Sequence, residues 1–169
     1  MNITLKDSVM IRPAEVKDAE AICNIYNHYV ENTTITFEEQ AVAIDDMRER
    51  ISGIIITLPF CVYEDNNRVT GYAYAAKWRA RSAYKYTVET TVYIDKENTG
   101  KGIGTQLYQR LLSELKDKGI HRAIGGIALP NESSVALHEK MGFEKVAEFN
   151  EVGYKFERWI NVGYWEYRI

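Results

Sequence analysis

The chain has 169 residues, which is the length of one globular domain with a sizeable core. With 46% apolar residues, 27% charged residues and only three prolines, the composition excludes a disordered, collagen-like or low-complexity chain. The net charge of -3 gives no general attraction to nucleic acid or acidic lipid, so any anionic ligand must be held by a local arrangement of groups.

The first part of the chain predicts one strand followed by two helices. A short apolar run at residues 9–11 is typical of a strand. Apolar residues spaced three and four apart predict a helix over residues 22–30 and another over residues 47–58, which Pro59 ends. Two helices therefore precede most of the predicted sheet.

The middle of the chain predicts three strands. Strand patterns at residues 60–63 and 69–76 are separated by Asp65-Asn66-Asn67, whose residues favour a tight turn, so the two strands form a hairpin. Residues 84–94 form the longest stretch with a period of two. We expect this third strand to lie at the centre of the sheet.

A glycine-rich turn, Gly100 to Gly104, follows this strand and leads into a helical pattern that Gly119 ends. Glycine lets backbone N–H groups approach phosphate oxygens, and a helix N-terminus adds about half a positive charge. The turn is therefore a candidate anion site, to which Lys101 could add a cation. The alternative is an ordinary tight connection, but each glycine weakens a helix start by about 0.5–1 kcal/mol unless the backbone needs it.

The last part of the chain predicts a strand, a short helix and two further strands. The strand covers residues 123–129, and the helix begins after Asn131 as N-cap and ends at Gly142. Two aromatic-rich strand patterns follow, near residues 146–154 and 163–169.

The order of these elements predicts an α/β (α+β) fold. A mixed sheet of about seven strands would be flanked by about four helices. Because no repeat and no linker divides the sequence, we expect one domain over residues 1–169.

Two familiar phosphate motifs do not match the glycine turn. A P-loop needs Ser or Thr where Gly102 stands, and a dinucleotide-binding fingerprint needs glycine where Thr105 stands. The turn instead resembles the acyl-CoA signature Q/R-x-x-G-x-G/A of the GNAT acetyltransferases, with Gly102 and Gly104 at its glycine positions. Thr99 departs from the Gln or Arg of that signature.

The resemblance covers essentially the whole chain and is to the phosphinothricin acetyltransferase-like branch of amino-acid N-acetyltransferases. The segments that carry it are Ile25-Tyr26-Asn27, Asn32-Thr33-Thr34, Gly71-Tyr72-Ala73, Trp78-Arg79-Ala80-Arg81, residues 88–94, residues 129–134, residues 137–143 and Lys155-Phe156-Glu157-Arg158-Trp159. It implies a mostly antiparallel sheet that splays between its fourth and fifth strands. It also implies direct transfer from acetyl-CoA to the α-amine of a small amino acid or analogue in a ternary complex. The branch commonly forms homodimers, and we expect the aromatic C-terminal strands to make that contact.

The resemblance also indicates which residues hold acetyl-CoA. A splayed strand leaves backbone groups that need partners, and these would contact the pantetheine arm. Asn131 matches a residue that hydrogen-bonds this arm, although a helix N-cap explains it equally well and both roles are compatible. The expected cosubstrate site comprises Val92, Tyr93, Ile94, Gly100, Lys101, Gly102, Ile103, Gly104, Thr105 and Asn131.

Two residues are candidates for acid–base catalysis. Glu89 resembles the general base that accepts a proton from the incoming ammonium, and glutamate is depleted in strands such as 84–94. The alternative is a solvated strand face. His138 stands where many GNAT enzymes have a tyrosine, and it could serve the leaving thiolate. The alternatives are a histidine on the helix surface and, for the thiolate, Tyr108 as a reserve candidate.

The amine substrate has its own candidate residues. The cluster Lys77, Arg79, Arg81 and Lys85 is too small for nucleic acid and better suits carboxylate recognition, with Arg79 favoured over Arg81. Phe37 either walls the substrate side chain or packs in the core. The expected substrate residues are Phe37, Arg79, Arg81, Glu89, Thr90 and Thr91.

Other chemistries are excluded. Cys23 and His28 are five residues apart and His121 stands alone, so no zinc spacing occurs. Cys23 and Cys61 suit reduced, buried thiols. No apolar run is long enough to cross a bilayer and the N-terminus lacks a secretion signal, so we expect a cytoplasmic protein without membrane contact.

Two rival functions remain. The acceptor could be a protein N-terminus, an aminoglycoside or a polyamine, none of which needs a carboxylate clamp at Arg79. The chain could also be a CoA-binding regulatory module without turnover.

Overall fold

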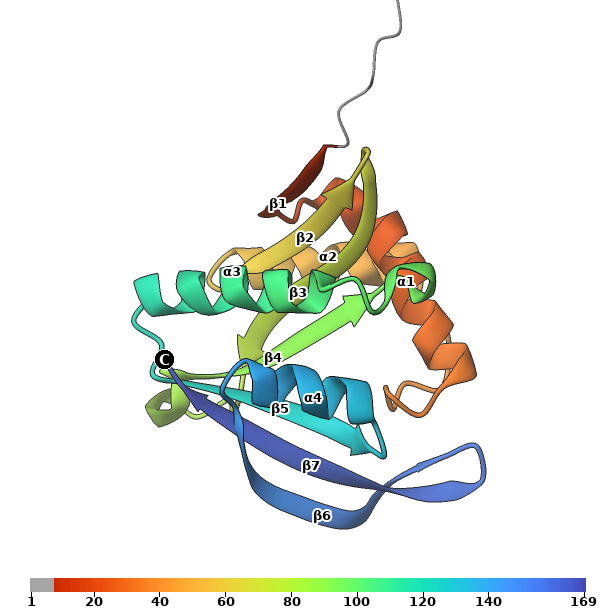
Figure 1. Ribbon diagram of the computed structural model, residues 1–169, viewed down its shortest axis with the longest axis vertical. Helices are drawn as coiled ribbons and strands as arrows, with labels where there is room; N and C mark the ends of the chain where they lie inside the picture. The colour runs from red at the N-terminus through yellow and green to blue at the C-terminus, as the bar shows by residue number, and fades with distance from the viewer. Residues whose placement is uncertain (1–7) are drawn as a thin grey trace, which may run out of the picture.

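The computed structural model describes residues 8–169 (Figure 1). Residues 1–7 of the expected domain lie outside the described residues. The prediction that they contain no secretion signal concerns this part of the chain. Three short 3-10 turns, Val16–Asp18, Ser82–Tyr84 and Lys96–Asn98, accompany the main elements. The main elements are β1 (Val9–Pro13), α1 (Ala19–Asn32), α2 (Ile44–Ile55), β2 (Phe60–Asp65), β3 (Arg68–Lys77), β4 (Thr87–Ile94), α3 (Ile103–Asp117), β5 (Arg122–Leu129), α4 (Glu132–Lys140), β6 (Glu144–Lys155) and β7 (Arg158–Arg168).

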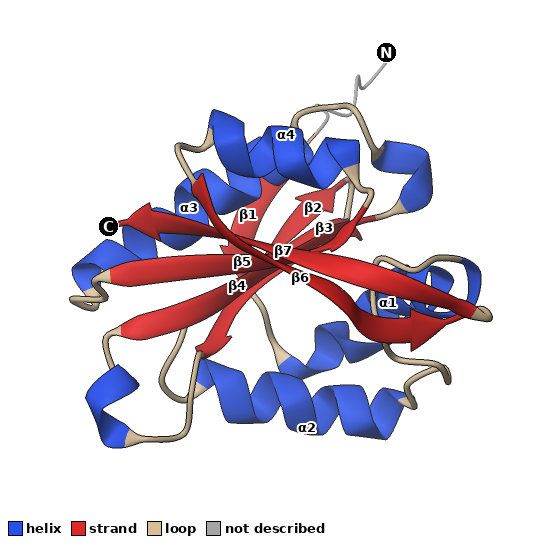
Figure 2. Cartoon of the chain, turned by 90° about the horizontal axis from the view of Figure 1, so that it is seen from below, coloured by secondary structure: helices blue, strands red, loops and turns tan. Residues whose placement is uncertain are grey.

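One seven-stranded sheet forms the centre of the molecule, in the order β1-β2-β3-β4-β5-β7-β6. All neighbouring strands are antiparallel except β4 and β5. Helices α3 and α4 cover one face, and α1 and α2 cover the other (Figure 2). The predicted fold class, the element order and the central position of β4 are confirmed.

Each face of the sheet has its own core, built by the amphipathic helices that cover it. Helix α3 buries Leu107, Leu111 and Leu115 against β3, β4 and β5. Helices α1 and α2 bury Ile22 and Ile51 against β2 and β3. These are the apolar stripes whose helical spacing was visible in the sequence.

The sheet opens between β4 and β5, as Figure 1 shows. The two strands pair only where Thr87–Glu89 face Arg122–Ile124. Beyond Glu89, β4 stays paired with β3 as far as Ile94, and β5 stays paired with β7 as far as Leu129. The expected splay is confirmed, and it leaves one edge of each strand available to a ligand.

Two predicted boundaries were wrong. The strand predicted from Tyr84 begins at Thr87, because Ser82–Tyr84 turns the backbone with hydrogen bonds back to Arg81 and Ser82. The alternating residue pattern continues through residues 84–86, but Tyr84 and Tyr86 are exposed. The pattern there does not mark a buried strand face. The helix predicted to reach Pro59 ends at Ile55.

Candidate active site

A cavity of about 560 Å³ lies where β4 and β5 separate. On the α1 and α2 face its wall includes Tyr26, Thr36 and Tyr74. On the α3 and α4 face it includes Tyr108 and His138. The cavity therefore reaches both faces of the sheet through the opening between the two strands.

Glu89 lies in the wall of this cavity. It faces away from Val88, which is buried under α3, so the side chain points toward the α1 and α2 face. Burial raises the pKa of the Glu89 carboxyl above its usual value, and the positive charge of Arg79 partly offsets this effect. A Cβ atom at Gly126 would lie 3.3 Å from Glu89 Oε1, so glycine on β5 leaves room for the carboxylate. Glu89 therefore lies half-buried in a cavity wall and not on a fully exposed strand face.

His138 lies inside the molecule, with only 4% of its surface exposed. Its Nδ1 is 2.7 Å from the Ser134 carbonyl oxygen, which can only accept a hydrogen bond, so Nδ1 carries a proton. Its Nε2 is 2.9 Å from the Tyr108 hydroxyl. Burial lowers the pKa of the His138 imidazole, although the bond to Ser134 opposes this. The alternative of a surface histidine is wrong, because α4 turns this residue inward.

The Tyr108 hydroxyl joins His138 to β4. It is fully buried and contacts the Thr90 hydroxyl at 3.2 Å as well as His138. Burial raises the pKa of Tyr108, so the phenol stays neutral at ordinary pH. Gly125 on β5 is needed beside this pair, because a Cβ atom there would lie 2.4 Å from His138 Nε2. Sequence reasoning ranked Tyr108 only as a reserve and missed both glycines of β5, whose adjacency was the available signal.

A second cavity of about 340 Å³ adjoins the first and reaches the glycine turn. The two cavities share five wall residues, from the segment after α1, from β4 and from the start of α4, namely Ile35, Val92, Tyr93, Asn131 and Ser134. The other expected cosubstrate residues in its wall are Ile94, Gly100, Gly102, Ile103, Gly104 and Thr105.

The glycine turn has the backbone that only glycine adopts easily. Gly100 has φ +75° and Gly102 has φ +79°, and Gly102 is the N-cap of α3. A Cβ atom at Gly104 would lie 3.0 Å from Leu137 of α4, so this glycine permits close packing. Lys101 is not in the wall of this cavity, and its Nζ donates at 2.9 Å to Oδ1 of Asn98, which is a wall residue.

Asn131 caps α4, as predicted. Its Oδ1 accepts from the Ser134 amide at 3.2 Å and from the Ser133 hydroxyl at 3.1 Å. It also lies in the walls of both cavities. The cap and a ligand contact are therefore compatible at this residue.

The structure does not bring Arg79 and Arg81 into the cavity that holds Glu89. Both lie in the wall of a separate cavity of about 400 Å³, together with Lys77, Lys85 and Lys118. The reason is that the chain leaves β3 after Lys77 and turns through Ser82–Tyr84 before β4 begins. Among the described residues that line the first cavity, none is Lys or Arg.

The segment 33–43 between α1 and α2 supplies part of the cavity wall through Ile35, Thr36 and Phe37. Phe37 is 41% exposed, and its ring packs on the backbone of Gly153 in β6. The predicted wall position of Phe37 fits the structure better than the alternative of a core position.

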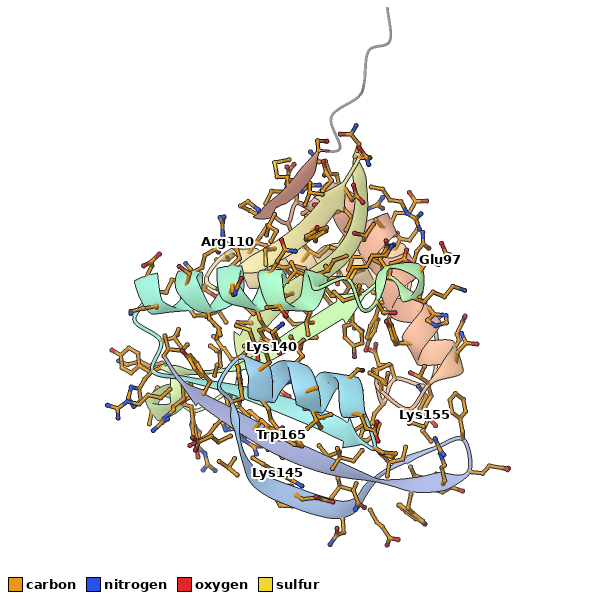
Figure 3. All side chains as sticks on the ribbon, in the orientation of Figure 1. Glu97, Arg110, Lys140, Lys145, Lys155 and Trp165 are labelled. Carbon is orange, nitrogen blue, oxygen red and sulfur yellow. The ribbon has the colours of Figure 1, made fainter. Side chains whose placement is uncertain are left out.

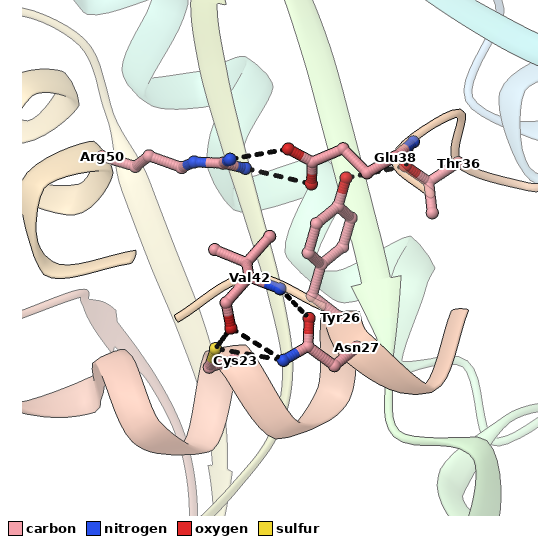
Figure 4. Close-up of polar contacts among 7 residues, drawn as sticks. All are labelled: Cys23, Tyr26, Asn27, Thr36, Glu38, Val42 and Arg50. Atoms are coloured by element: carbon pink, nitrogen blue, oxygen red, sulfur yellow. Dashed lines mark hydrogen bonds and ion pairs between the residues drawn. The ribbon is translucent and has the colours of Figure 1, made fainter. Parts of the chain in front are cut away.

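Polar contacts fix this segment to both helices (Figure 4). The Tyr26 hydroxyl lies 2.7 Å from Thr36 Oγ1. Arg50 donates to both carboxylate oxygens of Glu38, at 2.6 and 3.2 Å. Asn27 bonds both the amide and the carbonyl of Val42, so the segment is held at both ends.

The remaining expectations concern metals, thiols and membranes. In residues 8–169, no three His, Cys, Asp or Glu side chains are grouped as a metal site would need. Cys23 and Cys61 are buried free thiols, as predicted. Within the same residues, no helix combines the length and the apolar character needed to span a bilayer.

Comparison with known proteins identifies similar sequences and structures. The model of the acetyltransferase (GNAT) domain matches residues 11–162. A phosphinothricin N-acetyltransferase of Streptomyces viridochromogenes is 37% identical over 158 residues, covering 94% of this chain and 86% of the relative. An L-methionine sulfoximine/L-methionine sulfone acetyltransferase of Salmonella typhimurium is 35% identical over 160 residues, covering 94% of each chain.

A solved structure agrees with these matches. It is a GNAT superfamily phosphinothricin acetyltransferase from Sinorhizobium meliloti in complex with AcCoA. It superposes with a TM-score of 0.92 at 33% identity, covering 95% of this chain and 88% of that chain. The architecture derived above is therefore shared along nearly the whole length of both chains.

Proposed function

Because this chain belongs to the acetyltransferase (GNAT) domain family, we propose that it acetylates the α-amino group of a small amino acid or amino-acid analogue. The chain is an N-acetyltransferase, and its cosubstrate is acetyl-CoA. Phosphinothricin and methionine sulfone, which name its relatives, represent the proposed acceptor class.

One observation carries this proposal. The cavity between β4 and β5 has a carboxylate on one face of the sheet and a buried tyrosine–histidine pair on the other. Transfer of an acetyl group to an amine requires a base near the nitrogen and a hydrogen-bond donor near the sulfur. Glu89 and the tyrosine–histidine pair line the same cavity from opposite faces of the sheet, which supports both requirements.

On the amine side we assign Glu89 as the general base. Its raised pKa makes it a better proton acceptor than an exposed carboxylate. The proton of the incoming ammonium passes to Glu89, directly or through one water. Thr91 lies on the same side of β4 as Glu89, and Thr90 faces Tyr108. Both threonines line the cavity.

On the sulfur side we assign His138 together with Tyr108. With its proton on Nδ1 and donated to the Ser134 carbonyl, neutral His138 accepts a hydrogen bond at Nε2 from the Tyr108 hydroxyl. We propose that the Tyr108 hydroxyl turns from Nε2 to donate its hydrogen bond to the departing sulfur.

The glycine turn fits the diphosphate of acetyl-CoA. Gly100 and Gly102 expose backbone amides at the N-terminus of α3, where the helix dipole favours negative charge. Backbone groups of Val92–Ile94, together with Asn131, would hold the pantetheine arm in the adjoining cavity. Bound there, acetyl-CoA supplies the acetyl thioester.

The carboxylate of an amino-acid acceptor would be recognised by Arg79, with Arg81 beside it. Burial raises the pKa of Glu89, and the positive charge of Arg79 lowers it in part. This effect of Arg79 supports a position of its guanidinium within electrostatic range of the cavity. A movement of the segment 78–86 would be needed to bring the guanidinium to the ligand.

A second candidate acceptor is favoured by the cavity wall itself. Its described residues include Glu89 and the tyrosines Tyr26, Tyr74 and Tyr93, but no cation. Such a wall suits a polyamine or a peptide N-terminus, which carries no nearby carboxylate. Arg79→Ala should raise KM at least tenfold for a free amino acid and leave it unchanged for these acceptors. Arg48→Ala, an exposed arginine on α2, is the control.

A thiol-release assay tests the proposed activity. Free thiol is followed with acetyl-CoA and methionine, methionine sulfone, methionine sulfoximine, phosphinothricin, spermidine or a short peptide. Release with an amino acid supports the proposal, and release only with spermidine or peptide supports the second candidate. Binding of acetyl-CoA without release from any amine would indicate a regulatory module.

We further propose a cytoplasmic homodimer with one domain over residues 1–169. The two free, buried thiols are consistent with a reducing compartment. An exposed apolar surface on the β6–β7 hairpin, here called the hairpin patch, supports the homodimer. It comprises Val146, Phe149, Val152, Tyr154, Phe156 and Trp159.

A further inference from the structure

Lys155, the last residue of β6, is buried without an ion pair in the part of the chain that the structure describes. Only 2% of its surface is exposed. Its Nζ donates to the carbonyl oxygens of Val30 at 2.7 Å and Thr36 at 2.9 Å. Figure 3 shows Lys155 between the β6–β7 hairpin and the segment that follows α1. A buried ammonium is costly, so its presence requires a reason.

The two acceptors explain why a cation suits this position. Val30 lies in the last turn of α1, which ends at Asn32, so its carbonyl lacks the usual amide partner four residues ahead. The C-terminus of a helix also carries partial negative charge. Lys155 therefore caps a helix that lies more than a hundred residues away in the sequence.

The second acceptor belongs to the wall of the acceptor cavity. Thr36 lies between Ile35 and Phe37, and all three line the cavity that holds Glu89. On its other side, Thr36 Oγ1 contacts the Tyr26 hydroxyl. Lys155 thus fixes the backbone at the centre of this wall from the hairpin side.

Gly153, two residues before Lys155, contacts the same wall, because its lack of a side chain leaves room for the Phe37 ring. A Cβ atom there would lie 2.3 Å from Cζ of Phe37. The Phe37 ring therefore rests directly on the β6 backbone. One short stretch of β6 contacts the wall segment both by a hydrogen-bonding cation and by van der Waals packing.

We propose that Lys155 is a positioning residue and Gly153 a specificity-determining residue for the acceptor amine. Lys155 holds the segment 33–38 at a fixed distance from Glu89, and Gly153 sets how far Phe37 enters the cavity. The proposal rests on the proposed function, since it assigns this wall to the acceptor. Neither Lys155 nor Gly153 lines the adjoining cavity at the glycine turn, and Ile35 is the one residue of the segment 33–38 in its wall, so the acetyl-CoA site should depend on them less than the acceptor site does.

The test compares Lys155→Met with Lys145→Met, an exposed lysine on the same strand. With L-methionine sulfone as acceptor, K155M should raise KM for the amine about tenfold or more and KM for acetyl-CoA by a much smaller factor, because only Ile35 of the segment 33–38 lines the second cavity. K145M should change neither. An equal rise in both constants, or no rise in either, would overturn the positioning role.

A second variant guards against loss of folding. Gly153→Ala should change the ratio of kcat/KM for L-methionine sulfone to that for L-alanine at least fivefold, because the Phe37 ring must move. An unchanged ratio would overturn the specificity role, and it decides that role even where K155M does not fold.

Hydrogen exchange separates this inference from the proposed function. Amide exchange in residues 33–38 should become at least tenfold faster in folded K155M than in the wild type. Exchange in residues 103–112 should be unchanged. If wild-type protein acetylates no amine, the proposed function fails, whereas the exchange result still decides whether Lys155 holds the segment. Unchanged exchange in residues 33–38 would overturn that part.

Discussion

At the scale of single residues, Glu89 is the group on which the proposed chemistry depends most. Its carboxylate is half-buried, and a raised pKa means that protonation begins at a higher pH than for an exposed glutamate. Only the ionised form accepts a proton, so kcat/KM should fall as the pH falls through the raised pKa and level off above it.

Glu89→Gln tests this assignment with a side chain of nearly equal size. We expect kcat/KM to fall by about 10²- to 10⁴-fold, the usual contribution of a general base. The acidic limb of the pH profile should disappear in the variant. Full activity of the variant from pH 6 to 9 would contradict the assignment, and calorimetry with acetyl-CoA serves as the folding control.

The Tyr108 hydroxyl makes the second prediction at this scale. Because it bridges Thr90 and His138 in the buried wall, Tyr108→Phe should lower kcat by about 10²-fold and leave KM for the amine unchanged. Tyr63→Phe, a buried tyrosine of the same core, is the matched control. Full kcat in Tyr108→Phe together with loss in His138→Ala would assign the sulfur side to histidine alone.

At the scale of elements, the N-terminus of α3 depends on the backbone of the glycine turn. Gly102 has φ +79°, a conformation that costs other residues about 1–2 kcal/mol. Gly102→Ala should therefore lower Tm and weaken acetyl-CoA binding, because strain is relieved by moving the amides that face the ligand. Calorimetric titration and thermal unfolding measure the two effects.

Gly53→Ala provides the contrasting control. Gly53 lies in α2, and nothing stands within 4 Å of a Cβ atom placed there. Alanine should stabilise this helix by about 0.5–1 kcal/mol and leave the Kd for acetyl-CoA unchanged. If Gly102→Ala behaved in the same way, the turn would be an ordinary connection.

At the scale of the whole molecule, the hairpin patch leaves large apolar side chains in water. Trp159 is 62% exposed, and its ring lies 4.8 Å from that of Tyr154. Several large apolar side chains exposed on one hairpin are typical of an interaction site. The patch lies on β6 and β7, at the end of the sheet, where a second copy could cover it.

Trp159→Glu should convert the proposed homodimer to a monomer. Light scattering after size exclusion would then report half the wild-type mass, because a buried charge in the contact is costly. Ile56→Glu, an exposed apolar residue at the end of α2, should leave the mass unchanged. A wild-type protein with the mass of one chain would contradict the homodimer directly.

The sequence by itself determined the local features of this protein. The helical stripes, the Asn66-Asn67 turn, the glycine turn and the cap at Asn131 each depend on residues close together in the chain, whose periodicity and backbone preferences are readable. Glu89 was found through the resemblance to the acetyltransferases, with support from its residue type, which is unusual in a strand. The errors at Tyr84 and at the end of α2 lie at boundaries, where neighbouring patterns compete.

Only the tertiary structure decided how distant groups meet. The pairing of β4 and β5 over three residues creates the cavity, and no local pattern encodes where that pairing stops. The partnership of Tyr108 with His138, the displacement of Arg79 from the cavity and the contact of Lys155 with Val30 depend on chain packing across many residues. Local propensity fixes each segment's conformation, whereas burial and the need to pair every enclosed polar group fix which segments become neighbours.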